Sequence, residues 1–77
     1  MKQFAIHIGS FSDIREFVAL AIAQPFEVLV GCGDQLVNGK SLMAMFSLNY
    51  RRPLHVNVTC DDEAYTRFTT AAAKFLA

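Results

Sequence analysis

The chain has 77 residues, enough for one domain with a modest hydrophobic core. Its seven basic and seven acidic residues cancel, so no net charge draws it to nucleic acid or to an anionic membrane surface. No run of about 18 apolar residues is present to span a bilayer, and the first residues lead into a strand pattern instead of a signal peptide. We therefore expect a cytoplasmic protein with a single domain over residues 1–77.

The first part of the chain predicts a strand followed by a helix. Residues 3–8 alternate between two faces, as in a half-buried strand. Ser10 and, three residues later, Asp13 approximate a capping box, so a helix begins here and ends near Gln24, before Pro25. Five apolar residues at helical spacing predict its buried stripe: Ile14, Phe17, Val18, Ala21 and Ile22.

The middle of the chain predicts a hairpin and a short helix. Residues 26–32 alternate as a second strand, and Gly33-Asp34 fits a tight turn into a third strand over residues 35–38. The chain turns again at Asn38-Gly39, and a second helix runs from Ser41 to about Asn49. Serine before an apolar run is a good N-cap, because its hydroxyl accepts a hydrogen bond from a free backbone amide of the first turn.

The last part predicts a strand and a third helix. The fourth strand follows Pro53, and its inward residues are Leu54, Val56, Val58 and Cys60. Residues 61–63 are acidic, which suits the first turn of a helix because the helix dipole is positive there. The buried stripe of this helix is predicted to be Tyr65, Phe68, Ala72, Phe75 and Leu76. The element order βαββαβα predicts an α+β fold, an antiparallel sheet covered on one face by helices.

The segment VNGKSLMAMFSL, residues 37–48, resembles the regulatory-serine segment of HPr, the small phosphocarrier of the bacterial phosphoenolpyruvate-dependent sugar phosphotransferase system. That family typically shows Lys-Ser, an aliphatic-Met pair and a closing Ser-Leu, which match Lys40-Ser41, Leu42-Met43 and Ser47-Leu48. The resemblance extends weakly over most of the chain. It implies an HPr-like open-faced β-sandwich, in which a four-stranded antiparallel sheet of order 1-4-2-3 is covered on one face by three helices.

The resemblance also shows a departure at the phosphate-carrying position. An HPr carries phosphate on a histidine at the start of its first helix, followed closely by an arginine and a proline. Ser10, Ser12 and Asp13 occupy those places. A serine phosphate ester is too stable to pass its phosphate on reversibly, and Asp13 repels a phosphoryl group held at that turn. We therefore expect a non-enzymatic protein without histidine phosphotransfer and without a cofactor. A phosphocarrier component that uses a non-standard acceptor is the alternative.

Ser41 and the residues after it are the expected regulatory and partner-binding site. In HPr proteins of Gram-positive bacteria the matching serine is phosphorylated by a kinase, and the modified form binds a transcriptional regulator. Leu42, Met43 and Phe46 match the apolar patch with which the family binds partners. The resemblance thus implies protein partners: phosphotransferase-system enzymes, a serine kinase or a transcriptional regulator. The alternative is that Ser41 is only a helix N-cap.

The histidines and cysteines give weaker indications. His7 and His55 lie at outward positions of strands expected to be neighbours, so they form either a paired metal or pH-sensitive site or two solvated side chains. No third ligand stands out beside them, and we expect no metal. Cys32 and Cys60 lack metal-binding spacing, and we expect two free thiols in the core.

Overall fold

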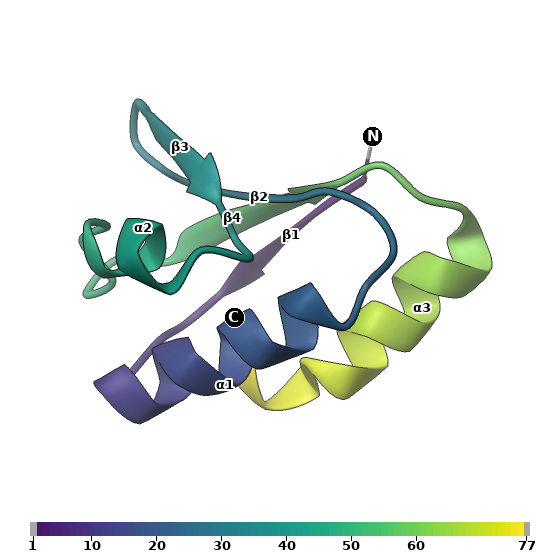
Figure 1. The fold of residues 1–77 in the computed structure, drawn as a ribbon, viewed down its shortest axis with the longest axis horizontal. Coiled ribbons are helices and arrows are strands. Elements are labelled where there is room, and N and C mark those ends of the chain that lie inside the picture. The colour runs from purple at the N-terminus through teal and green to yellow at the C-terminus, as the bar shows by residue number, and fades with distance from the viewer. Residues whose placement is uncertain (1, 77) are drawn as a thin grey trace.

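The computed structural model describes residues 2–76, which form one four-stranded antiparallel sheet and its covering helices (Figure 1). The elements are β1 (Lys2–Ile6), α1 (Phe11–Ile22), β2 (Val28–Cys32), β3 (Gln35–Asn38), α2 (Leu42–Phe46), β4 (Leu54–Val58), α3 (Asp62–Ala71) and the 3₁₀ turn η1 (Ala73–Phe75). The strand order is β1-β4-β2-β3. The expected fold class, an α+β open-faced sandwich of order 1-4-2-3 with three helices, is therefore confirmed.

The last strand in the sequence lies in the middle of the sheet. β4 pairs antiparallel with β1 on one side and with β2 on the other. β1 and β2 therefore run parallel to each other, and α1 connects them across β4, which is the split βαβ arrangement. The β2–β3 hairpin turns at Gly33, whose φ of 60° is the left-handed conformation that a glycine-first two-residue turn requires.

The core lies between the inward face of the sheet and the helices. Figure 1 shows α1 and α3 side by side on this face, with α2 near the end of the sheet that carries β3. Alternation places Val30 of β2 beside Val56 of β4, and Val56 also faces Phe4 of β1. The largest fully buried side chains are Phe17, Phe68, Phe75, Ile6, Ile14, Met45, Leu54, Val28, Val30, Val56 and Val58.

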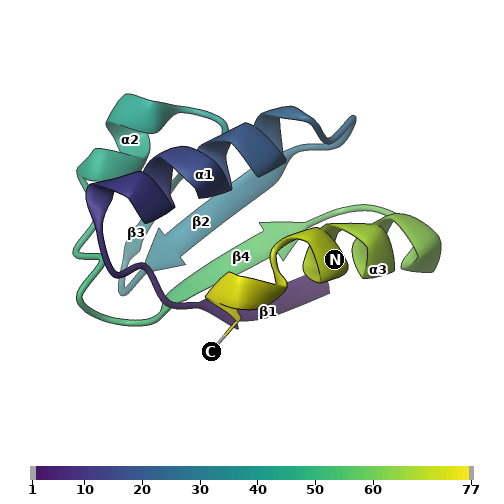
Figure 2. The same cartoon turned by 90° about the horizontal axis from the view of Figure 1, so that it is seen from below.

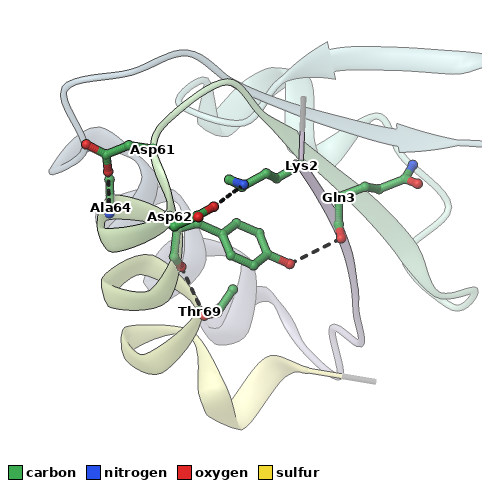
Figure 3. Close-up of polar contacts among 7 residues, drawn as sticks. Lys2, Gln3, Asp61, Asp62, Ala64 and Thr69 are labelled. Carbon is green, nitrogen blue, oxygen red and sulfur yellow. Dashed lines mark hydrogen bonds and ion pairs between the residues drawn. The ribbon is translucent and has the colours of Figure 1, made fainter.

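Local side-chain caps begin both long helices. The Ser10 Oγ accepts from the Asp13 backbone N at 3.3 Å, and the Asp13 carboxylate accepts from the Gly9 backbone N at 3.0 Å. The expected capping box is thus present, except that the carboxylate reaches the amide one residue before the cap. In α3, the Asp61 carboxylate accepts from the Ala64 backbone N at 2.8 Å (Figure 3).

Polar contacts join the start of β1 to the first turns of α3 (Figure 3). The Lys2 ammonium pairs with the Asp62 carboxylate, and the Tyr65 hydroxyl donates to the Gln3 backbone O at 3.2 Å. The hydrogen bond and the charge of Asp62 raise the pKa of Lys2, and the same contacts with Lys2 lower the pKa of Asp62. The Lys2 side chain is half-buried but the Asp62 carboxylate is exposed, so solvent weakens the pair.

Two residues predicted to complete helical stripes are exposed instead. Ile22 is the last residue of α1, which ends before the predicted Gln24, and it lies one helical step past the buried Ala21. Leu76 follows the 3₁₀ turn and has an extended backbone that bridges to Ile6, so the helical spacing no longer applies to it. The side chains of Ile22 and Leu76 are therefore exposed, and these two core assignments were wrong.

The strands are shorter than the alternation predicts. β1 ends at Ile6, because the next backbone N, that of His7, donates to the Phe75 backbone O at 2.7 Å instead of joining the β4 ladder. Cys32 ends β2, whereas Cys60 lies two residues beyond the end of β4. Both cysteines are free thiols, as expected, but they are half-buried at the margin of the core and not fully inside it. No helix within residues 2–76 is long and apolar enough to cross a membrane.

Candidate partner-binding surface

The turn before α2 is held tightly against the sheet. The Gly39 backbone N donates to the Val28 backbone O at 2.7 Å, and a Cβ added at Gly39 would lie 2.9 Å from the Val28 Cγ1. A side chain at this position therefore collides with the inward face of β2. Glycine allows the close approach that places the start of α2 beside the sheet.

Ser41 is the N-cap of α2, as predicted. Its Oγ accepts from the Ala44 backbone N at 3.3 Å, and its own backbone N donates to the Asn38 backbone O at 3.0 Å. The residue is half-buried, so part of it is accessible to solvent. The cap satisfies one of the free amides of the first turn.

Lys40 joins the α2 turn to α1. Its Nζ donates to the Gln24 backbone O at 2.8 Å, just beyond the end of α1. The last turn of α1 contains no basic residue of its own, so Lys40 supplies the positive charge that the helix dipole favours at that end. The side chain next to Ser41 therefore has a structural partner already.

The residues expected to bind partners lie on the outer face of α2. Leu42 and Phe46 are 36% and 41% exposed, and Met43 is 84% exposed. Met45, on the opposite side of the same short helix, is only 1% exposed and belongs to the core. A helix of five residues cannot bury all its apolar side chains, so one face packs inward and the other stays open to solvent.

Phe11, which was not among the predicted partner-binding residues, extends this surface onto α1. Its side chain is 61% exposed, and its ring packs edge-on against Phe46 with centroids 5.4 Å apart. Tyr50, four residues after the end of α2, also packs against Phe11, with centroids 6.0 Å apart. Figure 2 shows α2 beside the first turns of α1, as Figure 1 does. We call Phe11, Leu42, Met43 and Phe46 the α1–α2 apolar patch.

The signal for Phe11 was local but easy to overlook. It follows the N-cap Ser10 and precedes the buried Ile14 and Val18 by three and seven residues, so it continues their helical stripe by one turn. The ring of Phe11 lies at the exposed margin of this stripe and contacts Phe46, which joins the start of α1 and the end of α2 into one surface.

The turn at which the HPr resemblance would place the phosphate-carrying residue adjoins Phe11 of this patch. The Ser10 Oγ caps α1, and the Asp13 carboxylate is held on the Gly9 amide. Ser12, at the expected arginine place, is exposed. The turn therefore contains no imidazole and brings a carboxylate, and not a cation, to the start of the helix.

His7 and His55 are not cross-strand partners. The residue opposite His55 in the sheet is Ala5, and His7 lies past the end of β1. Of the two alternatives that the sequence left open, two solvated side chains fit this arrangement, because β1 ends where its backbone turns to Phe75. Both side chains are exposed. No group of three or more histidine, cysteine or acidic residues able to hold a metal ion occurs within the part of the chain that the structure describes.

Comparison with known proteins adds no family assignment: no protein-family model matches the chain, and neither does any curated protein.

Proposed function

We propose that this chain is an HPr-like protein of the bacterial phosphoenolpyruvate-dependent sugar phosphotransferase system family that binds proteins in the cytoplasm without carrying phosphate on a histidine. The observation that carries the proposal is the α1–α2 apolar patch. The start of α1 and the short helix α2, far apart in the sequence, present four exposed apolar side chains, and Phe11 of α1 packs against Phe46 of α2. The fold order and the segment around Ser41 support the family resemblance.

The size of the patch favours transient binding. The patch has four exposed residues, whereas a stable interface of roughly 800 Å² per partner involves about 20–30 residues a side. Exposed apolar patches of about 300–600 Å² on monomers are nonetheless often functional. A phosphotransferase-system enzyme, a serine kinase or a transcriptional regulator that binds and dissociates quickly fits such a surface.

Ser41 supplies the regulatory part of the proposal. A phosphate on its hydroxyl adds a charge of roughly −2 beside Leu42, at the rim of the patch. The charge favours a partner that brings arginine or lysine and opposes an apolar or acidic one. It also competes with the existing role of the hydroxyl, because the Oγ now accepts from the Ala44 amide.

Titration of the ¹⁵N-labelled chain with the purified first enzyme of the sugar phosphotransferase system tests the binding function. We expect chemical-shift changes centred on Phe11 and α2. Phe46→Ala should weaken binding about tenfold or more, because central aromatic residues dominate interfaces. Leu36→Ala is the matched control, since Leu36 is an exposed apolar residue on β3 outside the patch. Weaker binding by the Leu36 variant and not by the Phe46 variant contradicts the choice of surface.

The same mixture supplied with phosphoenolpyruvate tests the absence of phosphotransfer. We expect no acid-labile phosphate on the chain, because Ser10 offers no imidazole. Ser10→His alone should not restore transfer, since Ser12 provides no cationic clamp and Asp13 repels the phosphoryl group. Rapid, reversible phosphorylation of the unmodified chain would instead support the carrier function with a non-standard acceptor.

A further inference from the structure

The two methionines of α2 differ sharply in their access to solvent. Met43 is 84% exposed within the α1–α2 apolar patch, whereas Met45, two residues later, is 1% exposed in the core. The neighbours of Met43 in the patch are less open, from 36% for Leu42 to 61% for Phe11. A reagent in solution therefore meets the thioether of Met43 before it meets that of Met45.

We infer that Met43 makes partner binding by the α1–α2 apolar patch sensitive to peroxide, so that oxidation of this one side chain weakens the binding of partners there. The inference rests on the proposed function, because it concerns regulation of the same site. A lone pair of the Met43 sulfur attacks one oxygen of a hydroperoxide, a S–O bond forms and the O–O bond breaks. The sulfur loses two electrons, and the leaving oxygen takes a proton to give water or an alcohol.

The product changes the patch chemically without changing the core. A sulfoxide is polar and accepts hydrogen bonds strongly, whereas the thioether is apolar. The other side chains of the patch, Phe11, Leu42 and Phe46, carry no donor for it. A partner that covers the patch with an apolar surface must therefore remove water from the sulfoxide without replacing its hydrogen bonds, which opposes binding. Met45 remains reduced and continues to anchor α2.

The chemical step is tested first, with hydrogen peroxide and mass spectrometry. Trypsin cleavage after Lys40 and Arg51 places Met43 and Met45 in one peptide, in which fragment ions separate the two sulfoxides. In the folded protein we expect Met43 to oxidise at least about tenfold faster than Met45. In concentrated urea the two rates should become equal. Equal rates in the folded protein would overturn the inference at this step.

The effect on binding is tested with the same probe, the purified first enzyme of the phosphotransferase system. After peroxide, dithiothreitol is added to reverse thiol oxidation, which leaves the sulfoxide in place. We expect at least about tenfold weaker binding by the treated chain, and recovery after incubation with methionine sulfoxide reductases. Met45→Leu should keep this sensitivity. Met43→Leu should bind equally before and after peroxide, whatever its own affinity.

The outcomes separate the two proposals. An untreated chain that does not bind at all overturns the proposed binding function, and this inference falls with it. An untreated chain that binds as tightly as the Met43-oxidised chain overturns the inference alone. Peroxide sensitivity that persists in Met43→Leu also overturns it, because the responsible group is then elsewhere.

Discussion

The close approach of Gly39 to β2 predicts a measurable cost for a single methyl group. In Gly39→Ala the new Cβ lies 2.9 Å from the Val28 Cγ1 and 3.0 Å from the Val30 Cγ2, whereas carbon atoms in good contact are about 3.5–4.0 Å apart. The neighbours must therefore move by about 0.5–1 Å. Both valines are fully buried, so neither can turn toward solvent.

The magnitude follows from two opposing effects. Forcing an extra carbon into a packed core costs about 1–3 kcal/mol. Replacing glycine by alanine also restricts the unfolded chain, which returns about 0.4–1 kcal/mol where the backbone conformation suits alanine. The φ of Gly39 is not in the left-handed region, so this gain applies. We expect the free energy of unfolding to fall by about 1–2 kcal/mol, because overpacking is the larger effect.

Urea unfolding followed by far-ultraviolet circular dichroism measures this change, since the chain has no tryptophan. Gly9→Ala is the matched control, because the nearest atom to its Cβ is the flexible Asp13 Oδ2 at 3.3 Å, and we expect a change within about 0.5 kcal/mol. Val28→Ala removes the atom closest to the new Cβ. The free energy of unfolding of the Gly39→Ala, Val28→Ala double variant should therefore fall by at least about 0.5 kcal/mol less than the sum of the two single-variant losses. Equal stability of the two alanine variants, together with an additive cycle, refutes the steric argument.

Three further predictions concern the cap, the exposed ion pair and the thiols. Ser41→Ala should lower the free energy of unfolding by about 1 kcal/mol, because it removes the α2 cap. Ser41→Asp should lower it less, because aspartate also caps helices. Equal losses of the two variants in urea unfolding contradict this prediction. Because Lys2 lowers the pKa of Asp62, the stability that their pair contributes is complete above about pH 5 and is lost as pH falls through the folded-state pKa. The difference in free energy of unfolding between wild type and Asp62→Asn should therefore shrink toward about pH 2. A constant difference in acid unfolding contradicts a contribution from the pair. Thiol titration of the unfolded, non-reduced chain should count two thiols, since Cys32 and Cys60 are free; a count of zero contradicts this.

The sequence predicted those features that depend on near neighbours in the chain. The caps at Ser10 and Ser41 form with amides three residues away, so their residue types alone indicated them. The hairpin turn at Gly33 is equally local. Leu76 was assigned wrongly because its bridge to Ile6 joins segments 70 residues apart, which no periodicity reports. The strand order came from the family resemblance for the same reason.

In the candidate surface, too, the sequence predicted the local features and not those that depend on contacts between distant segments. The exposure of Leu42, Met43 and Phe46 was expected, because a short helix has more apolar side chains than it can bury. The contribution of Phe11 was missed, since its contact with Phe46 depends on how α1 and α2 lie relative to each other. That His55 lies opposite Ala5 and not opposite His7 depends on the register of β1 against β4, which the alternating pattern did not indicate.

The central place of β4 also determines when the protein can fold during synthesis. β1 pairs with β4, and in the sheet β2 meets β1 only through β4, so a nascent chain that ends before Leu54 has only the β2–β3 hairpin available among the strand pairings. Until β4 leaves the ribosome, the inward side chains of β1 and α1 lack the surface that buries them. Folding must therefore wait for long-range pairing, which is slow compared with the formation of helices and hairpins. During that interval the apolar first half of the chain is a ready target for a chaperone.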